Sequence, residues 1–207
     1  MKSSRTVTAA AALVILLAGS AFAAPPGPRD PDWPCEMIKV PELDLAQVWS
    51  GPQIDPATLD WQHDQAVADL VHEIAQRREP LDQAQAKVQV FATQSGADKR
   101  QKLLAVVAGL FSVLDAERGS VIAGLDRFGA RQKQLAAGLR DDNERLRQMQ
   151  SDPNADAGTV NQLTQKVTFE AEVFQDRRQA LRYACAVPGK IEQRLFALTQ
   201  FIQQQLQ

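Results

Sequence analysis

The chain has 207 residues, the length of one domain or two small ones. With 44% hydrophobic and 23% charged residues it can form a core, and whole-chain disorder is not expected. Of its 11 prolines, eight lie before residue 57. Because a proline inside a helix removes a hydrogen bond and clashes with the preceding turn, this distribution predicts an irregular N-terminal segment followed by an all-α remainder.

The first residues have the three parts of a secretory signal. Lys2 and Arg5 precede an apolar stretch at 9–18, and Ala-Phe-Ala at 21–23 offers a cleavage site. We therefore expect residues 1–23 to be a signal peptide that directs the chain to the periplasm. The alternative is an uncleaved anchor. The apolar stretch is shorter than the roughly 20 residues of a membrane-spanning helix, and no later segment is apolar enough to span, so we expect no stable membrane insertion after cleavage.

The charge of the mature chain limits the partners that we expect. Cleavage leaves 21 basic and 25 acidic residues, a net charge of −4. Nucleic acid binding depends on basic patches that release counterions from phosphates, and adhesion to anionic lipid also needs positive charge. We therefore expect no nucleic acid partner.

Two cysteines remain in the mature chain, Cys35 and Cys185. In an oxidising compartment they predict a disulfide bond, which would tie the proline-rich segment to a late helix. Neither cysteine belongs to a C-x-x-C motif, which leaves a redox or metal-binding pair as the less favoured alternative.

Residues 24–62 are expected to form a proline-rich strap. A short helix is predicted within it, starting at Pro41 and running to about Trp49. The three tryptophans of the chain lie in or at the end of this segment, and we expect them to anchor the strap to a helical body. They are Trp33, Trp49 and Trp61.

Residues 63–96 predict two short antiparallel helices. Apolar residues recur at i, i+3, i+4 and i+7 between Asp64 and Arg78, and Pro80 can start a second helix that stops at Ser95 and Gly96. The link between the two segments is very short, which favours antiparallel neighbours.

Residues 97–207 predict a long antiparallel coiled-coil hairpin with its tip near 152–157. Between Asp98 and Ser151, eleven of fourteen heptad seam positions are apolar, and polar residues occupy the other three. These three are Arg118, Gln132 and Asp142. The second arm has a similar pattern, with a kink or break expected at Pro188 and Gly189.

A register for the hairpin follows from its tip, because facing residues should have numbers that add to about 309. This rule pairs Leu135 with Phe174 and most other seam residues with apolar partners. It also places Cys185 beside Gly124. Because glycine lets another backbone come close, we expect the strap to cross the hairpin near Gly124 and Gly119.

Catalytic and metal-binding motifs are weak. His72 and Glu73 begin a zincin-like pattern, but Gln76 replaces the second histidine, and glutamine is a poor zinc ligand. His63 would lie on the opposite side of the same helix. We therefore expect no catalytic residues, no metal site and no cofactor.

The outer hairpin carries many charges of both signs. A solvated surface with ion pairs between the arms is the default interpretation, and a site that grips a partner is the alternative. Six arginines are the candidate interaction residues. They are Arg131, Arg140, Arg145, Arg147, Arg177 and Arg178.

The sequence therefore predicts a non-enzymatic helical interaction protein of the periplasm, a scaffold or chaperone-like accessory factor that binds envelope proteins through coiled-coil surfaces. In architecture alone it resembles periplasmic chaperones and the hairpins of efflux adaptors. A homodimer would also cover the exposed hairpin. The alternative function is an envelope sensor of stress, a ligand or a metal ion.

Overall fold

A computed structural model describes residues 30–54 and 60–207. The expected signal peptide, residues 1–23, lies outside this range. Within the described residues all regular elements are helices, which confirms the all-α fold. The α-helices are α1 (Gln65–Ala75), α2 (Leu81–Gln94), α3 (Lys99–Ser151), α4 (Ala157–Cys185) and α5 (Val187–Gln205), and the short 3-10 helices are η1 (Leu45–Gln47) and η2 (Gly96–Asp98).

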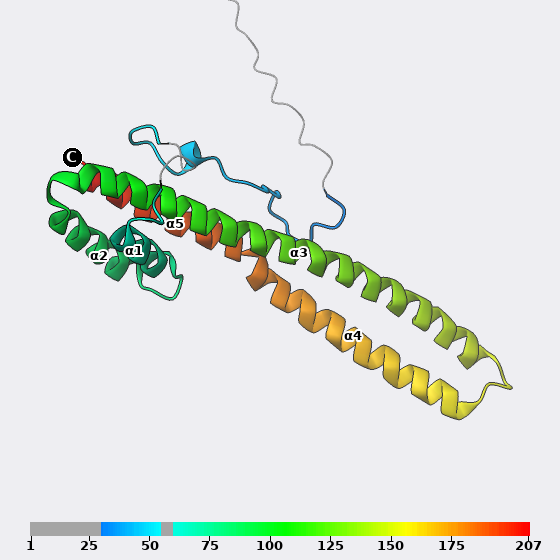
Figure 1. The fold of residues 1–207 in the computed structure, drawn as a ribbon. Coiled ribbons are helices and arrows are strands. Elements are labelled where there is room, and N and C mark those ends of the chain that lie inside the picture. The colour runs from blue at the N-terminus through cyan, green and yellow to red at the C-terminus, as the bar shows by residue number, and fades with distance from the viewer. Residues whose placement is uncertain (1–29, 55–59) are drawn as a thin grey trace, which may run out of the picture.

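The predicted hairpin dominates the molecule. The long helix α3 forms one arm, and α4 and α5 return along it as the other (Figure 1). The register is confirmed by contacts between the arms. Arg118 Nε lies 2.5 Å from Glu192 Oε1, and Lys166 Nζ lies 2.6 Å from Asp142 Oδ2. The residue numbers of these pairs add to 310 and 308, close to the predicted 309.

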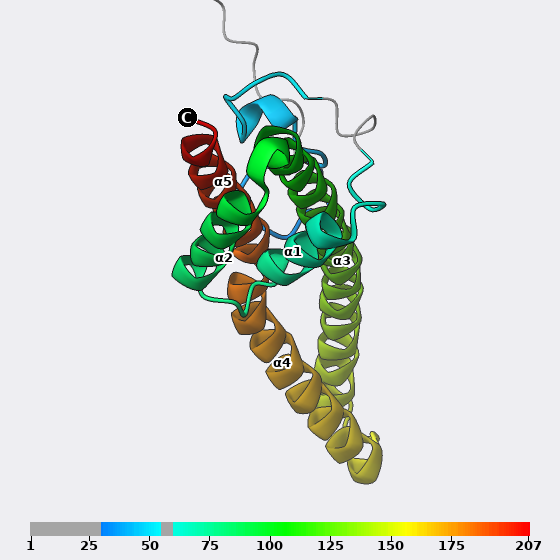
Figure 2. The same cartoon turned by 60° about the vertical axis from the view of Figure 1, so that its left-hand side comes forward.

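The second arm is interrupted, as expected, but two residues earlier than predicted. Helix α4 ends at Cys185, and Ala186 separates it from α5, which has Pro188 in its first turn. Proline is well tolerated there because its missing N–H is not needed. The discontinuity therefore precedes the proline. Seen from another side, α3 and α4 diverge from the tip toward this break (Figure 2).

The two short helices pack against the base of the hairpin. Helix α1 contacts α3, and α2 contacts α5 (Figure 2). Asp64 caps α1 by accepting hydrogen bonds from two backbone amides. Together the four elements enclose the main core, in which many side chains are fully buried. Among them are Val67, Val71, Ile74, Leu103, Val107, Leu110, Ile191, Leu195, Leu198 and Ile202.

Two of the three tryptophans are anchors, as predicted. Trp49 and Trp61 are each only 6% exposed. A Cβ atom at Gly109 would lie 2.9 Å from Cδ2 of Trp61, so the indole packs directly on the backbone of α3. Trp33 is half-buried, and its Nε1 donates a hydrogen bond to the carbonyl of Met37 at 2.7 Å.

The predicted helix from Pro41 to Trp49 is wrong in most of its length. Only the 3-10 turn Leu45–Gln47 forms, with Asp44 as its cap. The Leu43 amide donates to Asp115 Oδ1 of α3 at 3.3 Å, and the Thr199 hydroxyl donates to the Val48 carbonyl at 2.6 Å. These tertiary hydrogen bonds hold the segment against the hairpin on both sides of the 3-10 turn.

The disulfide between Cys35 and Cys185 is present, with Cα atoms 5.7 Å apart. The predicted crossing point is wrong, however. An added Cβ would meet nothing within 4 Å at Gly119 and only the Arg127 side chain, at 3.9 Å, at Gly124. The close approach is at Gly129, where a Cβ would lie 2.0 Å from the carbonyl oxygen of Asp32. The strap thus crosses α3 nearer the tip and then runs back to Cys185.

Candidate interaction surfaces

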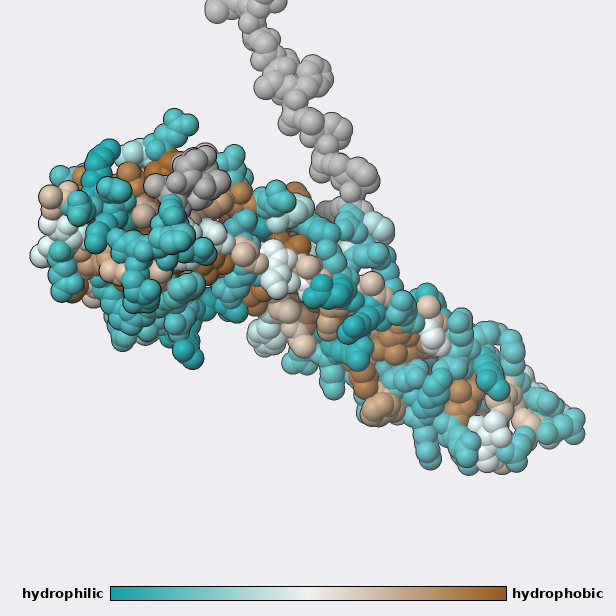
Figure 3. Space-filling view, viewed as in Figure 1, coloured by the Kyte–Doolittle hydropathy of each residue, from teal (hydrophilic) through white to brown (hydrophobic). Residues whose placement is uncertain are grey.

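The outer part of the hairpin, residues 129–181, is a layer of only two helices, which we call the distal arm. Helix α4 has no fully buried residue. Its seam side chains, including Leu163 and Phe174, are half-buried. On the distal part of α3, the apolar side chains with the least exposure are Leu139 and Leu146, each 9% exposed. Figure 3 shows apolar surface between polar side chains along this arm. The arm therefore leaves apolar seam surface open to a partner.

Polar groups weaken the seam further. Gln132 Nε2 donates to the Phe174 carbonyl at 3.2 Å, but the buried Gln132 Oε1 has no partner within the described residues. Asp142 forms its ion pair with Lys166. A buried acceptor without a hydrogen bond costs about 1–3 kcal/mol. The polar groups thus help to fix the register of the two arms, but the seam buries little apolar surface.

The six candidate arginines are all exposed, but they do not form one cluster. Arg131 and Arg147 are 16 residues apart on α3, about 24 Å along the helix. Arg147 pairs with Glu144 at 2.6 Å, which is the intrahelical pairing expected of a solvated face. Arg177 and Arg178 lie on α4 at the end of the arm away from the tip, where the hairpin register places them opposite Arg131. Their spacing along the two helices therefore does not make the six a single site.

An exposed aromatic stripe on α4 was missed by sequence reasoning. Phe169 is 66% exposed and Tyr183 is 72% exposed. Val173, Asp176 and Ala180 lie between them at alternating spacings of four and three, so the five residues share one face of the helix, which Asp176 interrupts with a charge. This spacing is present in the sequence, but Asp176 at its centre makes it a weaker signal than the neighbouring seam.

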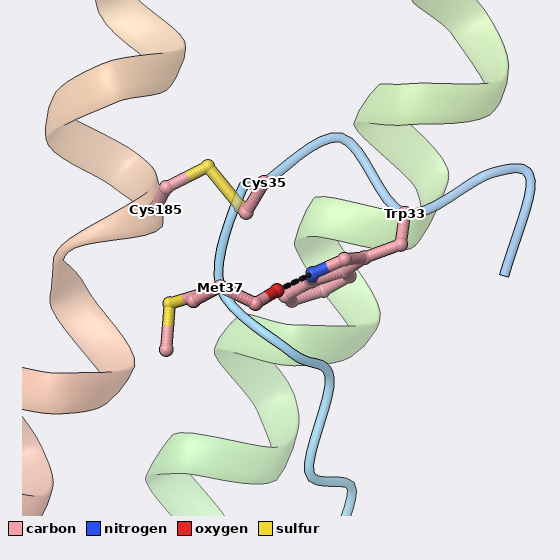
Figure 4. Close-up of a disulfide and its surroundings, with 4 residues drawn as sticks. All are labelled: Trp33, Cys35, Met37 and Cys185. Atoms are coloured by element: carbon pink, nitrogen blue, oxygen red, sulfur yellow. Dashed lines mark hydrogen bonds between the residues drawn. A yellow bond between two sulfur atoms is a disulfide. The ribbon is translucent and has the colours of Figure 1, made fainter. Parts of the chain in front are cut away.

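A cavity of about 770 Å³ opens between the strap and α4, beside the disulfide. Figure 4 shows how Cys35 turns toward Cys185 while Met37 points toward the helices of the second arm. The apolar lining of the cavity includes Met37, Leu181 and the disulfide. The basic residues that line the cavity are Arg178 and Arg182. Sequence spacing alone does not reveal this cavity, because residues about 150 positions apart build it.

The histidines lie apart from the disulfide. His63 is exposed and bonds to Asp60, whose side chain raises the pKa of the imidazole. His72 makes an edge contact with Trp61, with ring centroids 5.6 Å apart. Among residues 30–54 and 60–207, no three potential ligands gather in a way that could hold a metal ion.

Comparisons with protein families, curated proteins and solved structures find no match for this chain. No helix in the described part of the chain combines the length and apolar character that a membrane crossing needs. The disulfide is compatible with an exported protein, because such bonds persist in oxidising compartments.

Proposed function

We propose that this protein is an exported, periplasmic interaction protein without enzymatic activity, which holds envelope proteins on the distal arm as a scaffold or chaperone-like factor. The observation that carries this proposal is the absence of any fully buried residue in α4. A partner that packs on the arm would bury apolar surface, each Å² contributing roughly 25 cal/mol.

The difference between the covered base of the hairpin and its exposed outer part supports this role. The base of the hairpin is covered by α1 and α2, and the strap contacts the distal arm only at its inner end, near Gly129 and Lys133. Between there and the tip, the two helices of the arm stand without a third element among the described residues (Figure 1). A helical partner could add to the two-helix layer and complete a bundle, the usual way in which helical faces are buried.

The contacts favour this role over a metal sensor. His63 and His72 have other partners, and the two thiols are joined to each other. A site for a metal ion would need several of these groups together.

A shortened arm tests the proposal. Deleting residues 136–149 and 160–173 removes two heptads from each arm and keeps the facing register, the tip and the disulfide. We expect the variant to fold with the base unchanged and to lose crosslinking to envelope proteins and suppression of client aggregation.

The control is a variant in which exposed charges are exchanged without changing length. Swapping Glu144 and Arg147 preserves their ion pair and should preserve binding. If the shortened protein, shown to be folded by its circular dichroism, captures the same partners as the full chain, the distal arm is not the binding surface.

A further inference from the structure

The strap has two parts that are attached to the helices in different ways. The inner strap, residues 42–54, contains Val48 and Trp49, each 6% exposed, and its backbone bonds to Asp115 of α3 and Thr199 of α5. In the outer strap, residues 30–40, no residue is buried. No backbone group of the outer strap bonds to a helix within the described part of the chain. The inner strap is thus part of the core, and the outer strap lies on the surface.

The noncovalent contacts of the outer strap with α3 are largely solvent-exposed. Lys133 Nζ lies 2.7 Å from Asp32 Oδ1, and both side chains are 53% exposed. Lys39 Nζ lies 2.9 Å from Asp126 Oδ2, also in partly exposed surroundings. Exposed ion pairs contribute little to stability, whereas fixing the backbone of each residue has an entropic cost. The disulfide is therefore the principal attachment of this segment.

That disulfide joins the outer strap to the second arm of the hairpin. Cys185 is the last residue of α4, while Asp32 lies against Gly129 of α3. Figure 4 shows the segment passing from Trp33 to Cys35, whose side chain reaches α4. The outer strap therefore bridges the two arms where they diverge.

The bond is open to attack from solvent. Both cysteines are half-buried, and both line the cavity of about 770 Å³ between the strap and α4. The lining of this cavity includes two arginines and two carboxylates, whose charges balance, so it has no net charge to repel an incoming thiolate. Thiol–disulfide exchange depends on such access to a sulfur atom.

We propose that the bond between Cys35 and Cys185 is a redox-controlled attachment, reduced in the folded protein by a dithiol that enters the cavity. One thiolate of the dithiol attacks a cysteine sulfur and forms a mixed disulfide, while the other cysteine leaves with the electron pair and takes up a proton. The second thiolate of the reductant then closes its own disulfide and releases the first cysteine as a thiol. The dithiol is oxidised by two electrons, and the protein gains two thiols.

Reduction then releases the outer strap and leaves the inner strap in place. The boundary lies near Pro41, because Leu43 is the first strap residue whose backbone amide bonds to a helix within the described residues. Release uncovers the face of α3 around Gly129, at the inner end of the distal arm. The release itself does not rest on the proposed function, since it needs no partner on that arm.

Limited proteolysis of the full chain tests the release. Lys39 lies in the outer strap, and every other lysine of the described chain lies in a helix. A lysine-specific protease is added to the oxidised protein and to protein that dithiothreitol has reduced and iodoacetamide has capped. Because proteolysis follows the population of the open segment, cleavage after Lys39 should be about tenfold faster or more in the reduced protein. In NMR relaxation measurements the amides of Val48 and Trp49 should stay rigid in both forms.

Two variants separate the disulfide from the ion pairs. Cys35→Ser should be cleaved without reductant as fast as the reduced parent, and dithiothreitol should not change its rate. Lys133→Gln is the matched control, because it removes the pair with Asp32 and keeps the disulfide. In its oxidised form it should be cleaved as slowly as the oxidised parent.

Access to the folded protein is tested by the rate of reduction in urea below the unfolding transition. Direct attack through the cavity should proceed at a rate that is nearly independent of urea. Reduction that requires global unfolding would instead accelerate steeply, because the free energy of unfolding falls linearly with urea.

Three outcomes overturn the proposal. The first is equal cleavage after Lys39 in the oxidised and reduced proteins, and the second is a reduction rate that rises steeply with urea. The third is loss of rigidity at Val48 and Trp49 on reduction, which would mean that the bond holds the whole fold rather than the outer strap.

Discussion

The carbonyl oxygen of Asp32 occupies the space in which a side chain at Gly129 would begin. The distance from that oxygen to a Cβ built on Gly129 is 2.0 Å, and Cδ of Pro34 lies 3.1 Å from the same point. Backbone atoms cannot move aside as the end of a flexible side chain can. The absence of a side chain at this position therefore permits the strap to cross α3.

Replacing Gly129 with alanine should displace the strap and lower the free energy of unfolding by about 1–3 kcal/mol. Gly138→Ala is the matched control, since nothing lies within 4 Å of its Cβ and alanine favours a helix by about 1 kcal/mol. Urea unfolding followed by tryptophan fluorescence measures both. Equal stabilisation by the two substitutions would contradict the crossing at Gly129.

The buried Arg118 should be important for stability. It is 1% exposed and binds both Glu192 and the Pro41 carbonyl. Arg118→Ala leaves both partners unpaired and opens a void, which should cost about 3 kcal/mol. Arg147→Ala, which removes an exposed pair, should cost less than about 0.5 kcal/mol. Chemical denaturation of the two variants gives the comparison, and similar losses would show that burial of Arg118 is not decisive.

Cys35→Ser should lower the melting temperature under non-reducing conditions. The disulfide joins residues 150 positions apart and so restricts the unfolded chain strongly. The expected loss is about 2–4 kcal/mol. Reducing agent should lower the stability of the parent to that of the variant and leave the variant unchanged. An unchanged melting temperature in Cys35→Ser would remove the stabilising role of the bond.

The cap of α1 should make stability depend on pH. Backbone bonding to the Val67 amide, aided by the charge of Lys102, lowers the pKa of Asp64 below its usual 3.8. A lowered carboxyl pKa stabilises the fold above the unfolded value, and this contribution is lost as the pH falls through the folded value. Asp64→Ala should therefore cost about 1 kcal/mol at neutral pH, and the cost should shrink below pH 3.8.

Asp98 provides the control for that prediction. It stands before α3, but its side chain makes no capping hydrogen bond. Asp98→Ala should change the free energy of unfolding by less than about 0.5 kcal/mol. Unfolding curves at neutral and acidic pH distinguish the two positions. A cost for Asp64→Ala that is independent of pH would mean that the carboxylate charge is not involved.

Much of the hairpin could be predicted because its signals are local. Seam residues three and four apart define a helix face, and the turn after Ser151 fixes which residues face one another. For the same reason the polar seam residues Arg118 and Asp142 could be located before their partners were known. The face of α4 that carries Phe169 has the same spacing, but Asp176 interrupts it, so its signal in the sequence is weaker than that of the seam.

The strap could not be predicted at the same level, because its conformation depends on distant groups. The segment after Pro41 has helix-start signals, yet Val48 bonds to Thr199 across 151 positions. Glycine is needed at Gly129 and not at Gly124, although the two are indistinguishable in sequence. Only the path of Asp32 over the helix separates them.

The sequence by itself determined the all-α class, the facing register of the hairpin and the pairing of Cys35 with Cys185, since periodicity, turn chemistry and a single pair of thiols are properties of the chain. Tertiary structure alone decided where the strap crosses α3, which side chains of the distal arm stay open, and that a cavity forms beside the disulfide. The physical reason is that burial and close approach depend on residues far apart in sequence, which no local pattern encodes.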